Sequence, residues 1–288
     1  MIRKRTFRAA VCLFAALFAS ALFPACGRKA EQTEPPEPER PFDVYNDYHQ
    51  WTETEGYGSG ALVPQGPDGL YMDYYHTLPG EPAYASGRIV VGDSRCCQLG
   101  IYEQRAGRSD FASFAVWGGH YVNGEYPPIL AAGIVSDIEA CFREQIRACG
   151  KCTVFFFATV NDYDRSGVRN AESIAAAIDA AEYIASMEYE SGGRVYRPRV
   201  IVVGFDGCRH DGAFSGADPA VFNRYVEAYN GELRGAVEES PLLSANASLF
   251  GTVPEIMNGD CGFINDGLHY DDRTLRAICG FIIESDNN

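Results

Sequence analysis

From residue 88 onward, the chain alternates short, strongly apolar runs with longer segments in which apolar residues recur at helical spacing. The runs that we expect to form strands are 89–91, 111–117, 153–158, 199–204 and a short 248–253. The segments with helical spacing are 129–148, 171–189, 218–239 and 271–284. Strands that alternate with helices of this length are typical of a parallel sheet with helices on both faces. We therefore predict an α/β fold with three α/β/α layers and a central, mostly parallel sheet.

Small and polar residues follow three of these expected strands. Gly92-Asp93-Ser94 ends the first strand, Gly118-Gly119 follows the second, and Asn161 comes shortly after the third. In open parallel sheets, the ligand crevice lies beyond the carboxyl ends of the strands. The pattern therefore predicts that these residues share one edge of the sheet, and it indicates a functional site there.

A second polar motif lies near the end of the chain. Asn265-Asp-Gly-Leu-His-Tyr270 places an acid and an imidazole three residues apart, around a glycine. A serine nucleophile needs a base to take its proton, and the base needs an acid that fixes its tautomer. We predict these roles for Ser94, His269 and Asp266, if the fold brings the end of the chain back to Ser94.

This ordered set of motifs resembles the GDSL or SGNH hydrolases, a family of esterases, lipases and carbohydrate deacetylases. The resemblance rests on Gly92-Asp93-Ser94, Asn161-Asp162 and Asp266-x-x-His269, and it covers roughly residues 86–284. It implies a flavodoxin-like α/β/α fold and a serine ester hydrolase that uses neither a cofactor nor a metal.

The resemblance also implies an oxyanion hole with three donors. These would be the backbone N–H of Ser94, a backbone N–H of Gly118 or Gly119, and the side-chain amide of Asn161. Thr159 stands where the family usually has a glycine, two residues before the asparagine. For Asp93 we expect a role in holding the turn.

The residue after the proposed nucleophile is Arg95, where the family often has leucine. We interpret this difference as favouring a polar substrate over long acyl chains. We therefore expect hydrolysis of small-acyl esters, with an acetylated carbohydrate as the substrate class. Two alternatives remain open: a non-catalytic carbohydrate-binding lipoprotein on the same fold, and an O-acyltransferase that uses the same residues.

The N-terminal region has the pattern of an export signal. Residues 1–25 combine a basic start with an uncharged apolar run that is short for a membrane span. Leu22-Phe-Pro-Ala-Cys26 resembles a bacterial lipobox, which implies lipidation of Cys26; ordinary signal cleavage or a retained anchor is the alternative. Residues 26–41, rich in Pro and Glu, are expected to form a linker. We predict an extracytoplasmic, membrane-anchored lipoprotein, or alternatively a secreted protein.

Charge and cysteine spacing narrow the function classes. The net charge of −15 at pH 7 argues against a nucleic-acid partner. Cys149-Gly-Lys-Cys152 has the spacing of a redox or metal pair, but no second such pair accompanies it, so we expect no metal site. Residues 42–87 show no sustained periodicity, and we expect a loop-rich extension ahead of a hydrolase-like domain at 88–288.

Overall fold

The computed structural model describes residues 61–65, 70–77, 86–108, 110–116, 132–159, 161, 170–204, 206, 218–245, 249–263 and 268–285. All of them belong to one unit of the chain, Glu37–Asn288. The predicted signal peptide, Cys26 and the linker lie outside the described residues. Within the described part, no helix combines the length and the apolar character needed to cross a membrane.

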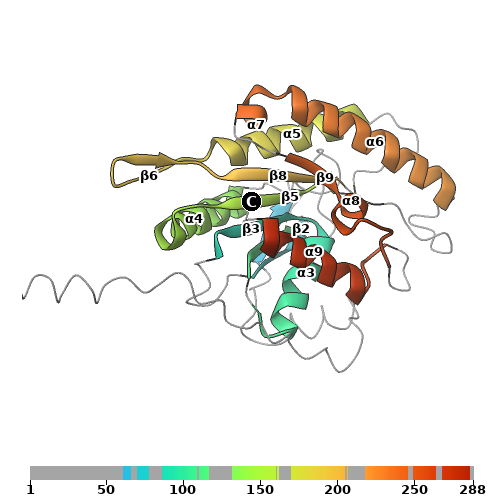
Figure 1. Ribbon diagram of the computed structural model, residues 1–288, viewed down its shortest axis with the longest axis horizontal. Coiled ribbons are helices and arrows are strands. Elements are labelled where there is room, and N and C mark those ends of the chain that lie inside the picture. Colours follow the sequence, from blue (N-terminus) through green and yellow to red (C-terminus); the bar gives the residue numbers. More distant parts are fainter. Residues whose placement is uncertain are drawn as a thin grey trace, which may run out of the picture. The chain divides into compact units, whose positions relative to one another are not determined.

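A seven-stranded sheet with the order β1-β2-β4-β3-β5-β8-β9 forms the centre of the fold (Figure 1). From β4 to β9 neighbouring strands pair in parallel, whereas β2 pairs antiparallel with both β1 and β4. The prediction of an α/β fold with a mostly parallel sheet is confirmed. The strands are β1 (Ala61–Gln65), β2 (Leu70–Thr77), β3 (Arg88–Gly92), β4 (Ala112–Val116), β5 (Thr153–Phe157), β8 (Arg199–Gly204) and β9 (Leu249–Thr252).

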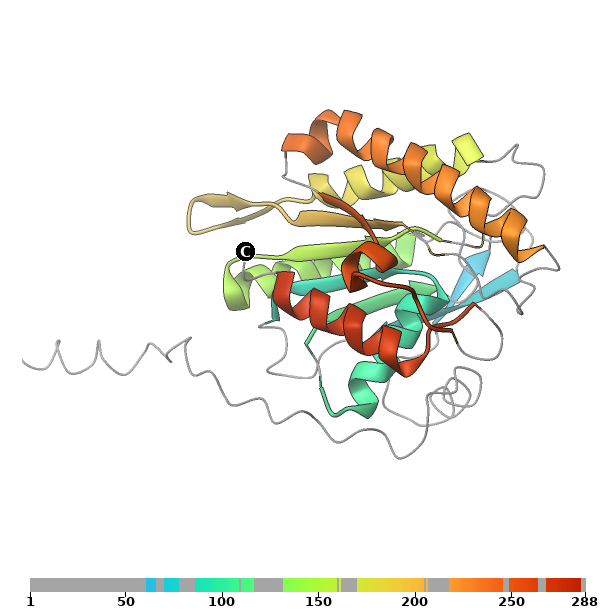
Figure 2. The same ribbon diagram turned by 45° about the vertical axis from the view of Figure 1, so that its right-hand side comes forward.

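Helices cover both faces of this sheet (Figures 1 and 2). Successive side chains of a strand point to opposite faces, so Phe156 packs into one hydrophobic cluster, and Phe155 and Phe157 pack into the other. Every residue of β5 is buried, as expected for a parallel strand between two helical layers. One cluster receives α4 (Ala132–Cys149), α5 (Asn170–Ser186), α6 (Pro219–Glu239) and α7 (Pro241–Ala245). The other receives α3 (Ser94–Arg105), α8 (Val253–Met257) and α9 (Asp272–Glu284).

Helices α6 and α9 begin at capping residues. The Asp218 carboxylate accepts hydrogen bonds from the N–H groups of Ala220 at 2.7 Å and Val221 at 3.4 Å, and Pro219 follows at the first helical position. Asp271 caps α9 by accepting the Thr274 N–H at 2.8 Å. Helix α9 therefore begins three residues after His269.

Two features of the fold differ from the sequence prediction. The segment 42–87, expected to be loop-rich, contains β1 and β2, which extend the sheet by an antiparallel hairpin. In the sequence of β2, polar and aromatic residues follow one another without strict alternation, so the hydrophobic pattern did not predict a strand. The predicted helix 171–189 ends at Ser186, because a small hairpin of β6 (Tyr189–Ser191) and β7 (Arg194–Tyr196) follows. Gly192 and Gly193 form its turn with φ of 60° and 75°, as a type I′ turn requires.

Candidate active site

The fold brings Ser94 and His269 into contact. His269 Nε2 lies 3.0 Å from Ser94 Oγ, which is hydrogen-bond distance for two residues 175 positions apart in the chain. Ser94 is the first residue of α3, directly after β3, and His269 precedes α9, which packs beside α3. Both side chains are buried, with exposed fractions of 7% and 5%. This pair therefore has the geometry of a hydroxyl with an adjacent base.

The pair lies at the point of the sheet where ligand sites are expected. The chain passes from β3 to β4 on one side and then crosses to β5 on the other, so the strand order reverses between β3 and β5. In doubly wound sheets, ligands bind at this switch point, beyond the carboxyl ends of the strands. Ser94 follows β3, and Thr159 and Asn161 follow β5. The sequence motifs and the strand order thus indicate the same edge of the sheet, at the carboxyl ends of β3 and β5.

Gly92 allows the helix that carries Ser94 to begin close to the sheet. A Cβ atom at this position would lie 2.5 Å from Cys96 Sγ and 3.0 Å from Phe157 Cβ. The contact with Cys96 Sγ is shorter than real Cβ atoms show, and the contact with Phe157 Cβ is tight, because the first turn of α3 lies against the end of β5. A side chain at this position would therefore force its neighbours to shift.

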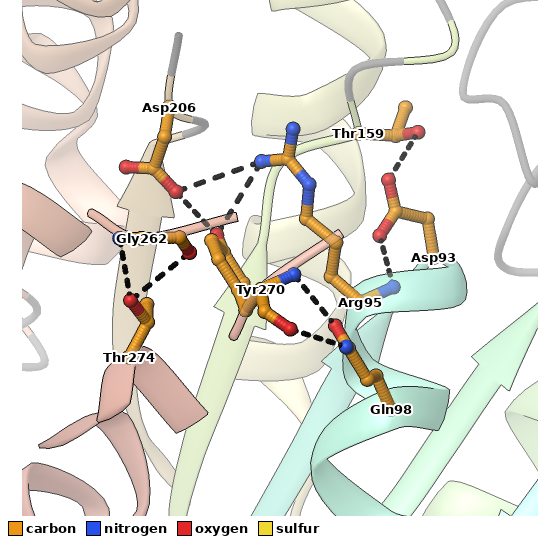
Figure 3. A network of polar contacts seen from close by, with 8 residues as sticks. All are labelled: Asp93, Arg95, Gln98, Thr159, Asp206, Gly262, Tyr270 and Thr274. Atoms are coloured by element: carbon orange, nitrogen blue, oxygen red, sulfur yellow. Dashed lines mark hydrogen bonds and ion pairs between the residues drawn. The ribbon is translucent and has the colours of Figure 1, made fainter. Parts of the chain in front are cut away.

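Asp93 joins the start of α3 to the loop after β5 (Figure 3). Its Oδ1 accepts the Arg95 N–H at 3.0 Å, and its Oδ2 accepts the Thr159 hydroxyl at 3.1 Å. The Thr159 oxygen in turn accepts the Asn161 N–H at 3.1 Å. Asp93 thus holds the turn, as expected, and its bond to Thr159 gives a physical reason for threonine at a position where a glycine was expected.

Asn161 is half-buried, and its backbone is fixed by this chain of hydrogen bonds. Ser94, His269 and Asn161 are the predicted site residues that the structure describes. Gly118, Gly119 and Asp266 lie outside the described residues. Their predicted roles, like the direction of the Asn161 amide, remain predictions.

A buried polar cluster lies beside the Ser94–His269 pair, and the sequence analysis did not foresee it (Figure 3). Arg95 Nη1 lies 3.6 Å from Asp206 Oδ2, and the guanidinium carbon is 5.3 Å from the centre of the Tyr270 ring. The Tyr270 hydroxyl donates a hydrogen bond to Asp206 Oδ2. Arg95, Asp206 and Tyr270 are at most 3% exposed. We interpreted Arg95 as a sign of a polar substrate, but its charge is matched inside the protein by Asp206.

The charges in this cluster depend on one another. Burial opposes the charge on Arg95, yet Tyr270, Asp93 and Asp206 together raise its pKa above the ordinary value. Burial raises the pKa of Asp206, and Arg95 opposes that shift. Burial and the nearby Asp206 also raise the pKa of Tyr270 well above its usual range, so its hydroxyl stays protonated and can donate.

The described residues contain no group of three or more His, Cys, Asp or Glu side chains placed to hold a metal ion.

The sequence gives only weak signals for the buried polar cluster around Tyr270. Asp206 follows a predicted strand by two residues, and Gln98 lies four residues after Ser94. Neither position reveals its partner, because the contacts join segments far apart in the chain.

No known protein-family model matches the chain, and no curated protein matches it. Solved structures with a similar fold were found. An aryl esterase from M. smegmatis has a TM-score of 0.49 at 13% identity, over 69% of this chain and 98% of that chain. Est24, a carbohydrate acetylesterase from Sinorhizobium meliloti, has a TM-score of 0.46 at 14% identity, over 69% and 97% of the two chains.

Proposed function

We propose that this protein is a serine ester hydrolase in which Ser94 is the nucleophile, His269 the base and Asp266 the acid that orients it. The observation that carries this proposal is the 3.0 Å contact between Ser94 Oγ and His269 Nε2 at the switch point of the sheet. A hydroxyl is a weak nucleophile at neutral pH, and a neighbouring imidazole activates it by accepting its proton.

The proposed reaction has two halves. As Ser94 Oγ attacks the ester carbonyl, its proton passes to His269 Nε2, which then gives it to the leaving alcohol oxygen as the bond to the acyl carbon breaks. Water, deprotonated by the same base, then attacks the acyl-enzyme, releases the carboxylic acid and restores Ser94. No cofactor takes part.

The oxyanion of each tetrahedral intermediate needs donors. Ser94 is the first residue of α3, and the first N–H groups of a helix have no partner within the helix. Its N–H is our first proposed donor. A backbone N–H of Gly118 or Gly119 and the Asn161 amide complete the proposal, and the tether from Asp93 through Thr159 supports the assignment of Asn161.

For the substrate we infer a small-acyl ester of a polar, carbohydrate-type alcohol. The resemblance of the Ser94, Asn161 and Asp266–His269 motifs to a family that contains carbohydrate deacetylases supports this choice. Arg95 does not contribute to it, because its guanidinium is paired with Asp206 inside the protein.

We further infer that the protein is exported and anchored to a membrane by lipid on Cys26, with residues 26–41 as a tether. The basic start, the short apolar run and the Leu22–Cys26 motif support this localisation. Stable anchoring takes two or more acyl chains, so the mature N-terminus should carry a diacylated Cys26. If an intact-mass measurement finds an unmodified N-terminus, the lipid anchor is excluded and the alternative, a secreted enzyme, is supported.

A short-chain aryl ester assay tests the hydrolase proposal. We predict that Ser94→Ala lowers kcat/KM by at least about 10³-fold while the melting temperature stays close to that of the wild type. The matched control is Ser173→Ala, which removes another buried hydroxyl, in α5 on the other side of the sheet. This control should keep its turnover. Near-normal hydrolysis by Ser94→Ala would overturn the proposal.

A further inference from the structure

Helix α3 contacts the chain around His269 at three points. Ser94 contacts His269, and the next residue of each segment repeats this pairing, because Arg95 Nη1 donates to the Tyr270 hydroxyl at 3.4 Å. One turn further along the helix, Gln98 contacts Tyr270 as well. The residue after the proposed base is thus attached to the helix that carries the proposed nucleophile (Figure 3).

Gln98 fixes the backbone of Tyr270. Its Oε1 accepts the Tyr270 N–H at 3.0 Å, and its Nε2 donates to the Tyr270 carbonyl at 2.8 Å. Residues four apart lie on the same face of a helix, so Gln98 lies one turn from Ser94 on the same face. Gln98 is completely buried, and its two hydrogen bonds allow a single orientation of its amide. The peptide units on both sides of Tyr270 are therefore held against α3.

The ring end of Tyr270 is held from the opposite direction. Its hydroxyl donates to Asp206, which follows β8, and the guanidinium of Arg95 lies over the ring at 5.3 Å from its centre. Tyr270 is completely buried. The side chain is consequently fixed at both ends, and the backbone of His269 is fixed with it.

We propose that Tyr270 is a positioning residue, which holds His269 Nε2 at bonding distance from Ser94 Oγ through its contacts with Gln98, Arg95 and Asp206. This inference rests on the proposed function for its effect on turnover. A displacement of about 1 Å at a reacting group can cost about 10²-fold in rate. Loss of the Tyr270 hydroxyl should therefore lower kcat, whereas substrate binding should change little.

A purely structural role of Tyr270 predicts a change in stability without a change in kcat. Removal of a buried hydroxyl would then lower the melting temperature and leave the kcat of the folded protein unchanged. Tyr229 provides the matched control, because it is 1% exposed and its hydroxyl lies 2.9 Å from Ser173 Oγ between α5 and α6. Tyr229→Phe removes an equivalent hydroxyl on the other side of the sheet.

The experiment compares Tyr270→Phe, Gln98→Met and Tyr229→Phe with the wild type in the aryl ester assay. We expect kcat to fall about 10- to 100-fold in Tyr270→Phe, with KM within about threefold of the wild-type value. Gln98→Met should show the same division between kcat and KM, which keeps the test informative if one variant fails to fold. Tyr229→Phe should keep the wild-type kcat at a comparable loss of melting temperature.

Crystal structures of the wild type and Tyr270→Phe provide a measurement that needs no turnover. We expect the separation of His269 Nε2 and Ser94 Oγ to exceed hydrogen-bond distance in the variant alone. If the wild type hydrolyses no ester but the separation changes in this way, the proposed function fails and the positioning role stands. Unchanged separation, unchanged kcat in both Tyr270→Phe and Gln98→Met, or an effect confined to KM would overturn the inference.

Discussion

Gly92 illustrates how one residue without a side chain positions the proposed nucleophile. The turn from β3 into α3 passes so close to Cys96 and Phe157 that a Cβ would lie within 2.5 Å and 3.0 Å of them. Ser94 follows two residues later, so a shift of this turn moves its hydroxyl relative to His269. The packing of α3 against β5 and the position of the Ser94 hydroxyl therefore both depend on the absence of a side chain at Gly92.

We predict that Gly92→Ala lowers both stability and activity. Overpacking of a buried site typically costs about 1–3 kcal/mol, and the shift of α3 should lower kcat as well. Gly235→Ala is the control, because this glycine of α6 has open space around it and alanine is the better helix former. Urea denaturation and the ester assay measure both effects. A second substitution, Cys96→Ala, should restore part of the loss; full activity of Gly92→Ala would contradict the steric explanation.

Helix α3 carries Ser94 at its first residue and an ion pair near its other end, in which Glu103 is buried and Arg108 is half-buried. Glu103 is 2% exposed, and Arg108 Nη2 lies 2.6 Å from its Oε1. Its Oε2 accepts the Asp110 N–H at 3.3 Å. Burial raises the pKa of Glu103 to about 7, against the opposing effect of Arg108. We therefore expect the last turns of α3 to respond to pH near neutrality.

The sign of this effect follows from proton binding. The folded state binds the Glu103 proton more tightly than the unfolded state, whose carboxyl has its ordinary pKa of 4.5. The free energy of unfolding therefore falls as pH rises from about 4.5 to about 7. We predict that Glu103→Gln removes this dependence, so that its stability relative to the wild type increases between pH 5 and pH 8 by up to about 3 kcal/mol. Urea denaturation at several pH values measures the difference, and a constant difference would contradict the assignment.

For the fold of the entire domain, the parallel core could be predicted because its strands are apolar at nearly every position. Thr153–Phe157 is the clearest example, since both of its faces are buried. A cap such as the one at Asp218 is accessible to sequence analysis for a similar reason, because it is a local contact. Strands β1 and β2 could not be predicted, since their pairing with the rest of the sheet leaves no regular pattern in their own sequence.

In the site as well, local motifs could be recognised, whereas contacts between distant segments could not. Ser94 and His269 could be paired from short motifs, and the structure places them 3.0 Å apart. The contacts of Gln98 and Asp206 with Tyr270 could not be predicted, because each joins segments that local periodicity does not relate. Arg95 was misinterpreted for this reason, since its partner Asp206 lies 111 positions away in the chain.

Mapping the adduct of a fluorophosphonate on the purified protein by mass spectrometry tests whether Ser94 is an activated nucleophile. The reagent bonds to an activated serine hydroxyl, so it reports on Ser94 without knowledge of the natural substrate. We predict a single adduct, on Ser94, and labelling at least about 100-fold slower in His269→Ala. An adduct on another serine would rule out Ser94 as the nucleophile, and an unchanged labelling rate in His269→Ala would rule out His269 as its base.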